Sequence, residues 1–210
     1  MGDFGRLTEA QIDALKEVGS IGAAHAATAL SQLSDQQIMI TVPSVRVVPL
    51  SEMPDLLGER ERVLAAIYAR VLGDARGGAL LLFPRESALN LVDIMMKRPL
   101  KTAKFLFGME RSCLEEAGNI LIGSFLTALS DFLDISLMPS PPEAAFDMVG
   151  AVLEFTATEF AGDVDYLFCA QNEFIDASKL ISGSFLLILH NEFVDLIVRK
   201  TELKMKHRNP

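Results

Sequence analysis

Residues 112–123 read SCLEEAGNILIG, and this stretch decides how the rest of the sequence is interpreted. It belongs to a run of apolar and small residues at helical spacing, which predicts a long helix over about 109–133. Ser112, Glu116 and Asn119 are four and three residues apart, so their side chains share one face of that helix. The positions around them are apolar. We therefore expect a mostly buried helix with one narrow polar edge in water.

The same pattern stands earlier in the chain, in a helix predicted from Thr8 to about Leu33 by a capping sequence and by apolar spacing. Adding 99 to a residue number in this first copy reproduces the residue type in these pairs: Glu17 and Glu116, Ile21 and Ile120, Thr28 and Thr127, Ala29 and Ala128, Leu30 and Leu129, Ser31 and Ser130, Pro43 and Pro142. The polar matches carry most weight, because apolar residues recur in any buried helix. The sequence therefore predicts an internal duplication.

The remaining residues predict strands and shorter helices in both halves. We expect strands over 38–42, 45–50, 63–72, 78–83, 135–138, 164–175 and 181–189, and helices over 84–97, 141–158 and 191–204. The fold class is therefore α/β (α+β), in a single domain over residues 1–210. Its halves, about 8–100 and 105–205, are expected to share a β-sheet around a pseudo-two-fold axis. No Gly/Pro/Ser-rich linker lies near residue 100, which favours one body.

Composition excludes several classes of function. The formal net charge of −9 argues against nucleic acid or an anionic membrane surface as the main partner. No apolar run reaches the roughly 20 residues that cross a bilayer, and the first residues lack a secretory pattern. Two cysteines and three histidines without zinc-site spacing predict neither a disulfide framework nor a metal centre. We expect a cytoplasmic protein without a metal of its own.

From the residues alone, the polar edge of the second helix has two interpretations. An exposed glutamate and asparagine are more often a solvated surface than a functional site.

Gly118 and Gly123 each cost about 1 kcal/mol relative to alanine inside a helix, and the close approach of a second backbone would offset that cost. That backbone could belong to the protein's own core or to a docking partner.

The spacing of the polar residues resembles the signature of the CheC/CheX/FliY phosphatases. That signature is aspartate or serine, three residues, glutamate, two residues, asparagine, twenty-two residues, then proline. The second half satisfies every position, with Ser112, Glu116, Asn119 and Pro142. The first half gives Asp13, Glu17 and Pro43, but it has Ser20 where the signature has asparagine.

This resemblance implies a phosphatase, a hydrolase that removes the phosphoryl group from the aspartate of a CheY-like response regulator in chemotaxis. Asn119 would orient the attacking water, and Glu116 would anchor the receiver's lysine. Ser112 and Asp13 would be supporting contacts, and the Glu17/Ser20 site would be weak or inactive. The resemblance implies no cofactor in this chain, with Mg²⁺ held by the receiver.

Two other functions remain open at this stage. A non-catalytic adaptor could bind phosphorylated CheY or the receptor deamidase CheD, the latter through a helix that the resemblance places near Asp147 and Met148. The asparagine at position 119 favours the enzyme over the adaptor. An unrelated α/β protein with a small-molecule pocket has little support, because the sequence lacks a phosphate-binding glycine loop and a Ser/His/Asp set.

Overall fold

The computed structural model describes residues 9–35, 37–40, 44–49, 60–159, 166–176 and 180–208. The predicted positions Thr8 and Pro43 lie outside these ranges. In chain order the elements are α1 (Glu9–Ser34), β1 (Ile38–Ile40), β2 (Ser44–Pro49), β3 (Val63–Gly73), β4 (Gly77–Pro84), α3 (Arg85–Met95), α4 (Met109–Leu133), β5 (Leu137–Pro139), β6 (Glu143–Met148), α5 (Val149–Glu159), β7 (Tyr166–Asp176), β8 (Ser182–Leu189) and α6 (Asn191–Arg208).

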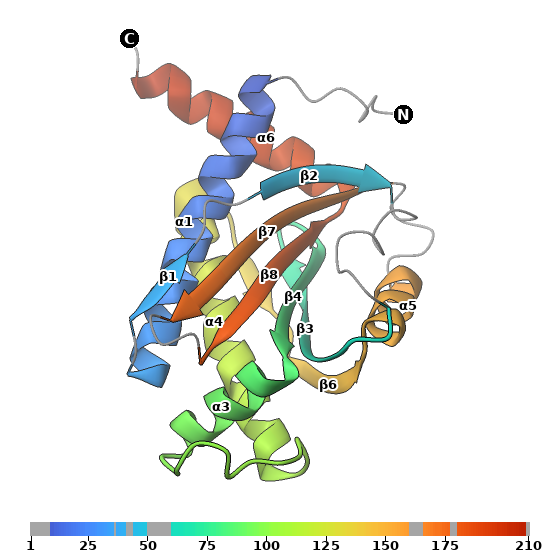
Figure 1. The fold of residues 1–210 in the computed structure, drawn as a ribbon. Helices are drawn as coiled ribbons and strands as arrows, with labels where there is room; N and C mark the ends of the chain where they lie inside the picture. Colours follow the sequence, from blue (N-terminus) through green and yellow to red (C-terminus); the bar gives the residue numbers. More distant parts are fainter. Residues whose placement is uncertain are drawn as a thin grey trace.

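The strands form one antiparallel sheet with a repeated plan (Figure 1). Its centre is the pair β4 and β8, flanked by β3 on one side and β7 on the other. The short strands β1 and β2 both pair with β7, while β5 and β6 both pair with β3. The two edges are therefore built in the same way by segments about 99 residues apart. The predicted fold class, a duplicated unit around a shared sheet, is confirmed.

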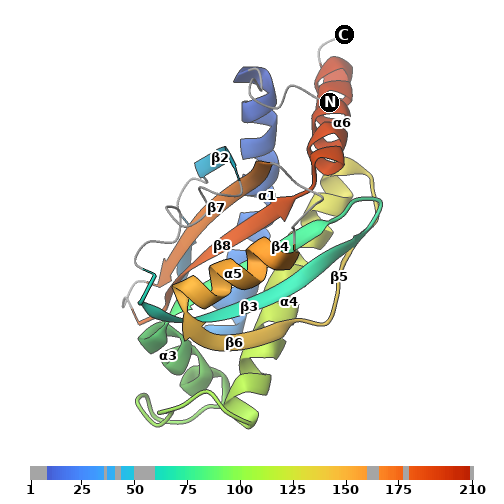
Figure 2. The same cartoon turned by 90° about the vertical axis from the view of Figure 1, so that its right-hand side faces the viewer.

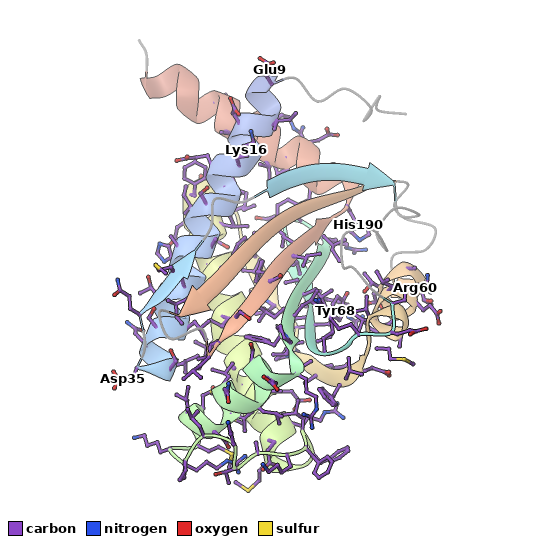
Figure 3. The ribbon with its side chains drawn as sticks, in the orientation of Figure 1. Glu9, Lys16, Asp35, Arg60, Tyr68 and His190 are labelled. Atoms are coloured by element: carbon purple, nitrogen blue, oxygen red, sulfur yellow. The ribbon has the colours of Figure 1, made fainter. Side chains whose placement is uncertain are left out.

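The long helices α1 and α4 cover one face of the sheet and run in opposite directions. In Figure 3, Glu9 and Asp35 mark the upper and lower ends of α1, whereas α4 rises from the bottom of Figure 1. Helix α5 covers the other face, in front of β3 and β4 in Figure 2. The side chains accordingly form a large core under α1, α3 and α4 and a smaller one under α5.

The ring of Phe125 lies between the helix pair and the sheet. Phe125 of α4 stacks on Phe185 of β8, with ring centroids 4.2 Å apart and an interplanar angle of 22°. On α1, a Cβ added to Gly22 would lie only 2.6 Å from the Phe125 ring. The glycine therefore gives the ring the space to reach the middle of the core, where it is fully buried.

The sequence prediction was wrong over residues 141–148, where a helix was expected. The structure has strand β6 there, paired with β3 so that Glu143 lies opposite Tyr68 and Met148 opposite Val63. The two prolines at its start and the two alanines after them favour a helix locally, but pairing with β3 satisfies the backbone groups of this segment. The duplication itself would have predicted the strand, because β2 lies 99 residues earlier. The other predicted elements are confirmed to within a few residues.

We expect Phe125→Ala to destabilise the fold by about 3–5 kcal/mol, because it empties the centre of the larger core. Phe105→Ala is the matched control, since its ring is two thirds exposed, at 67%. The free energy of unfolding is measured by urea titration of both variants. Equal losses would contradict the assigned role of Phe125.

Candidate functional site

The side chains predicted for the second site share the solvent-facing side of α4. Ser112, Glu116 and Asn119 are all exposed. The opposite side of the helix is buried, including Ala117 and Leu121. The carboxylate and the amide therefore stand one helical turn apart on a helix that its own core holds in place.

Glu116 and Asn119 make no side-chain hydrogen bond or ion pair with any residue that the structure describes. The adjacent Glu115 differs, because it pairs with Arg111 at 2.9 Å and accepts a hydrogen bond from the backbone of Ala144 at 3.3 Å. Glu115 thus tethers α4 to β6, while Glu116 and Asn119 stay available to a partner.

The first motif lies on α1, with Asp13 and Glu17 exposed and Ser20 half-buried. Asp13 pairs with Lys16 at 3.5 Å, so the first motif contains a cation that is paired with its aspartate. Because α1 and α4 are antiparallel, the two motifs lie at opposite ends of the helix pair. Lys16 marks the upper end in Figure 3. The structure therefore brings together the residues within each motif, but not the two motifs.

The two glycines of the second motif have different surroundings. A Cβ at Gly118 would lie 2.4 Å from Cγ2 of the fully buried Ile67, so the close approach comes from the protein's own core. A Cβ at Gly123 would meet nothing within 4 Å. Gly123 is four residues after Asn119, on the same side of the helix. Packing within the chain therefore explains Gly118 but leaves Gly123 unexplained.

Other reactive groups near the motif do not form a catalytic set. Cys113 is half-buried, and its thiol donates to Sδ of Met95 at 3.8 Å. Burial raises the pKa of the Cys113 thiol, so it is a poor source of thiolate. Among the described residues, no three His, Cys, Asp or Glu side chains gather to hold a metal ion, and no helix could span a membrane.

Three further residues, Asp147, Met148 and His25, lie outside the motifs. Asp147 and Met148, suggested for contact with CheD, were expected on a helix but lie at the end of strand β6, and both are exposed. His25 is exposed on α1. Neither observation adds a group to the two motifs.

Comparison with known proteins decides the family. A model described as the CheC-like family matches residues 11–47 and 109–144, the segments that contain the two motifs. The chain is also 33% identical over 203 residues to the protein named CheY-P phosphatase CheC of Bacillus subtilis (strain 168), covering 94% of this chain and 97% of that protein. The chain belongs to the CheC-like family.

Two other known proteins are also similar to this chain. The flagellar motor switch phosphatase FliY of Bacillus subtilis (strain 168) is 33% identical over 137 residues, which cover 65% of this chain and 35% of FliY. The X-ray structure of Thermotoga maritima FliY superposes with a TM-score of 0.76 at 22% identity, covering 94% of this chain and 98% of that one. The latter shows a shared fold. The family predicted from the doubled motif is thus confirmed.

The glycines of the CheC-like motif give opposite predictions for stability. Gly118→Ala overfills the contact with Ile67 and is expected to destabilise by about 1–3 kcal/mol, reduced by the helix preference of alanine. Gly123→Ala meets no neighbour and is expected to stabilise by up to about 1 kcal/mol. Urea titration of the two variants measures both values. Changes of the same sign would contradict these surroundings.

Proposed function

We propose that this chain hydrolyses the aspartyl phosphate of a CheY-like response regulator in the cytoplasm, with Asn119 and Glu116 as the acting side chains. The observation that carries the proposal is the unpartnered amide of Asn119, exposed one turn from an unpartnered carboxylate on a rigidly packed helix. The relative named CheY-P phosphatase CheC, which matches nearly the whole chain, supports the same activity.

The reaction requires few catalytic groups from the phosphatase itself. An aspartyl phosphate is a reactive mixed anhydride, and the receiver supplies Mg²⁺ and a lysine around it. Water attacks phosphorus, the bond from phosphorus to the aspartate oxygen breaks, and the products are the free carboxylate and inorganic phosphate. An in-line water is the missing component, and positioning it accelerates such a reaction strongly.

Asn119 suits this task because an amide both accepts and donates hydrogen bonds and does not titrate near neutral pH. In the proposed complex it enters the receiver's active site and holds the water in line with the leaving oxygen. It does not act as a general base. Glu116, which only accepts, pairs with the ammonium group of the receiver's lysine and fixes the direction of approach.

The open space beside Gly123 supports a protein as the substrate. Gly123 follows Asn119 by one turn, and nothing in the described structure fills the space that a side chain would take. A backbone segment of the receiver could therefore come close to α4 at this position. The cost of glycine inside the helix would then be offset in the complex rather than in the free chain.

The first motif is proposed to be the weaker one. Ser20 is shorter than asparagine by an amide group, and it is half-buried rather than exposed. An error in reach of about 1 Å can cost 10²-fold in positioned chemistry. Lys16, paired with Asp13, also places a positive charge within the first motif, and this charge would oppose an incoming ammonium group.

We expect Asn119→Ala to lower the rate of receiver dephosphorylation by about 10²-fold, because the water loses its orienting group. Ser20→Ala should leave most of the activity in place. Thr127→Ala, an exposed position on α4 outside the motif, is the control. Decay of radiolabelled phosphorylated receiver measures all three variants. Equal losses in Asn119→Ala and Ser20→Ala would contradict the proposed asymmetry, and binding without faster decay would indicate an adaptor.

In an Asn119→Ala background, Ser20→Asn is expected to restore measurable dephosphorylation, because it gives the first motif the amide that it lacks. The same decay assay reports the gain against the Asn119→Ala parent. An unchanged rate would mean that Lys16 or the partial burial of position 20 also limits the first motif. Adding Lys16→Glu, the charge found at the matching position 115, separates these two causes.

A further inference from the structure

The loop between α3 and α4 carries the most exposed apolar side chains in the described part of the chain. Phe105, Phe107 and Met109 are 67%, 74% and 72% exposed. The two rings stack on each other, with centroids 6.2 Å apart. The loop forms the lower end of the molecule in Figures 1 and 2, next to the beginning of α4. Such a cluster of large exposed apolar groups is a common mark of an interaction surface.

The same loop is strongly basic in an otherwise acidic chain. Residues 97–109 read KRPLKTAKFLFGM, with four cations and no acidic residue, whereas the whole chain has a net charge of −9. Lys97, Lys101 and Lys104 are exposed, and their ammonium groups make no ion pair with a described residue. The loop is therefore suited to a surface that is both apolar and acidic.

Asp93, a fully buried carboxylate, holds this loop in shape. It accepts hydrogen bonds from the backbone N–H groups of Thr102 and Ala103, both at 2.9 Å, and it pairs with Arg98. Arg98 also donates to Glu110, at the first turn of α4, at 3.0 Å. The pairing with Asp93 raises the pKa of Arg98, so the charge is retained. A loop fixed in this way loses little conformational freedom when a partner binds.

Met109 places the loop on the same side of α4 as the motif. It precedes Ser112 by three residues and Glu116 by seven, which puts the three on one helix face and Met109 about 10 Å from Glu116 along the axis. A standard protein interface buries about 800 Å² per partner, which corresponds to a disc roughly 16 Å in radius. One docked protein centred on Glu116 would therefore cover this end of the loop.

We propose that this loop, residues 97–109, is the docking surface for the phosphorylated receiver. The loop binds the receiver beside its phosphorylation site, while α4 places Asn119 in that site. The inference rests on the proposed function, because the occupant is the substrate itself. The partner would present an apolar surface next to its acidic phosphorylation site. An anionic membrane would also suit a basic and aromatic loop, but the net charge of −9 and continuity with the motif favour the receiver.

The loop distinguishes the second motif from the first. The offset of 99 carries Lys104, Phe105, Phe107 and Met109 to positions 5, 6, 8 and 10, which are glycine, arginine, threonine and alanine. The first motif therefore lacks this pattern at the corresponding positions. Docking would thus favour the second motif independently of the exchange of asparagine for serine.

The first test replaces exposed apolar groups and compares matched positions. The loop variant combines Phe105→Ser with Met109→Gln, and the control combines Phe155→Ser with Met138→Gln, the same residue types exposed outside the loop. Each full chain is titrated with a CheY-type receiver activated by Mg²⁺ and beryllofluoride, which mimics the phosphate without turnover. We expect the loop variant to raise Kd at least tenfold and the control less than about twofold. Thermal unfolding of both should match the unmodified chain.

The second test changes charge. Lys101→Glu with Lys104→Glu is expected to raise Kd and to flatten its dependence on salt, because the attraction between the loop and the receiver is lost. Arg62→Glu with Arg76→Glu is the matched control, since both are exposed cations outside the loop that make no ion pair with a described residue. An equal rise in Kd for both variants would mean that only the net charge matters, and it would overturn docking at the loop.

The outcomes separate this inference from the proposed function. If both apolar variants bind alike while Asn119→Ala still abolishes hydrolysis, docking at the loop is wrong and the phosphatase proposal stands. If the loop variant alone loses binding but the unmodified chain never accelerates decay, docking is right and hydrolysis is wrong. A third outcome concerns membranes: the unmodified chain could sediment with phosphatidylglycerol vesicles while the loop variant does not, with the same Kd for the receiver in both. That result would assign the loop to a membrane and overturn the proposal.

Discussion

The structure depends on one ring, Phe125, held between Phe185 of the sheet and the bare backbone at Gly22. This contact lets α1 and α4 lie close together on a single face of the sheet. Once both helices turn their small and apolar sides inward, only their outward sides are left for water. The outward sides carry most of the polar motif residues, so close packing in the core determines which side chains a partner can meet.

The helices and most strands could be predicted from the sequence because their signals are local. Around Asn119, residue spacing alone predicted the helix, its polar face and the matching motif in the first half of the chain. Residues 143–148 could not be placed in this way, because their alanines favour a helix and only pairing with β3 makes them a strand. Spacing placed Glu116 on the exposed face, but only the folded structure shows that Glu115 pairs with Arg111 and accepts a hydrogen bond from the backbone of Ala144.

The loop before α4 was missed for a related reason. Its lysines look like the end of a helix and its phenylalanines look like core residues, so nothing in the sequence separates Leu106, which is buried, from Phe105 and Phe107, which are not. The decisive residue is Asp93, whose hydrogen bonds to Thr102 and Ala103 fix the chain. A buried carboxylate that accepts backbone hydrogen bonds from a distant loop has no sequence signature of its own.

The opposite direction of α1 and α4 has a consequence for how such a protein can change over generations. Each motif occupies its own end of the pair, and none of its residues forms the shared ring contact of Phe125 with Gly22 and Phe185. A substitution within one motif, such as serine in place of asparagine at position 20, therefore alters one end at little cost in stability, while the other end keeps its full scaffold. Duplication gives the chain two copies of the motif, and their separation allows one copy to accumulate substitutions, or to acquire another use, without loss of the other.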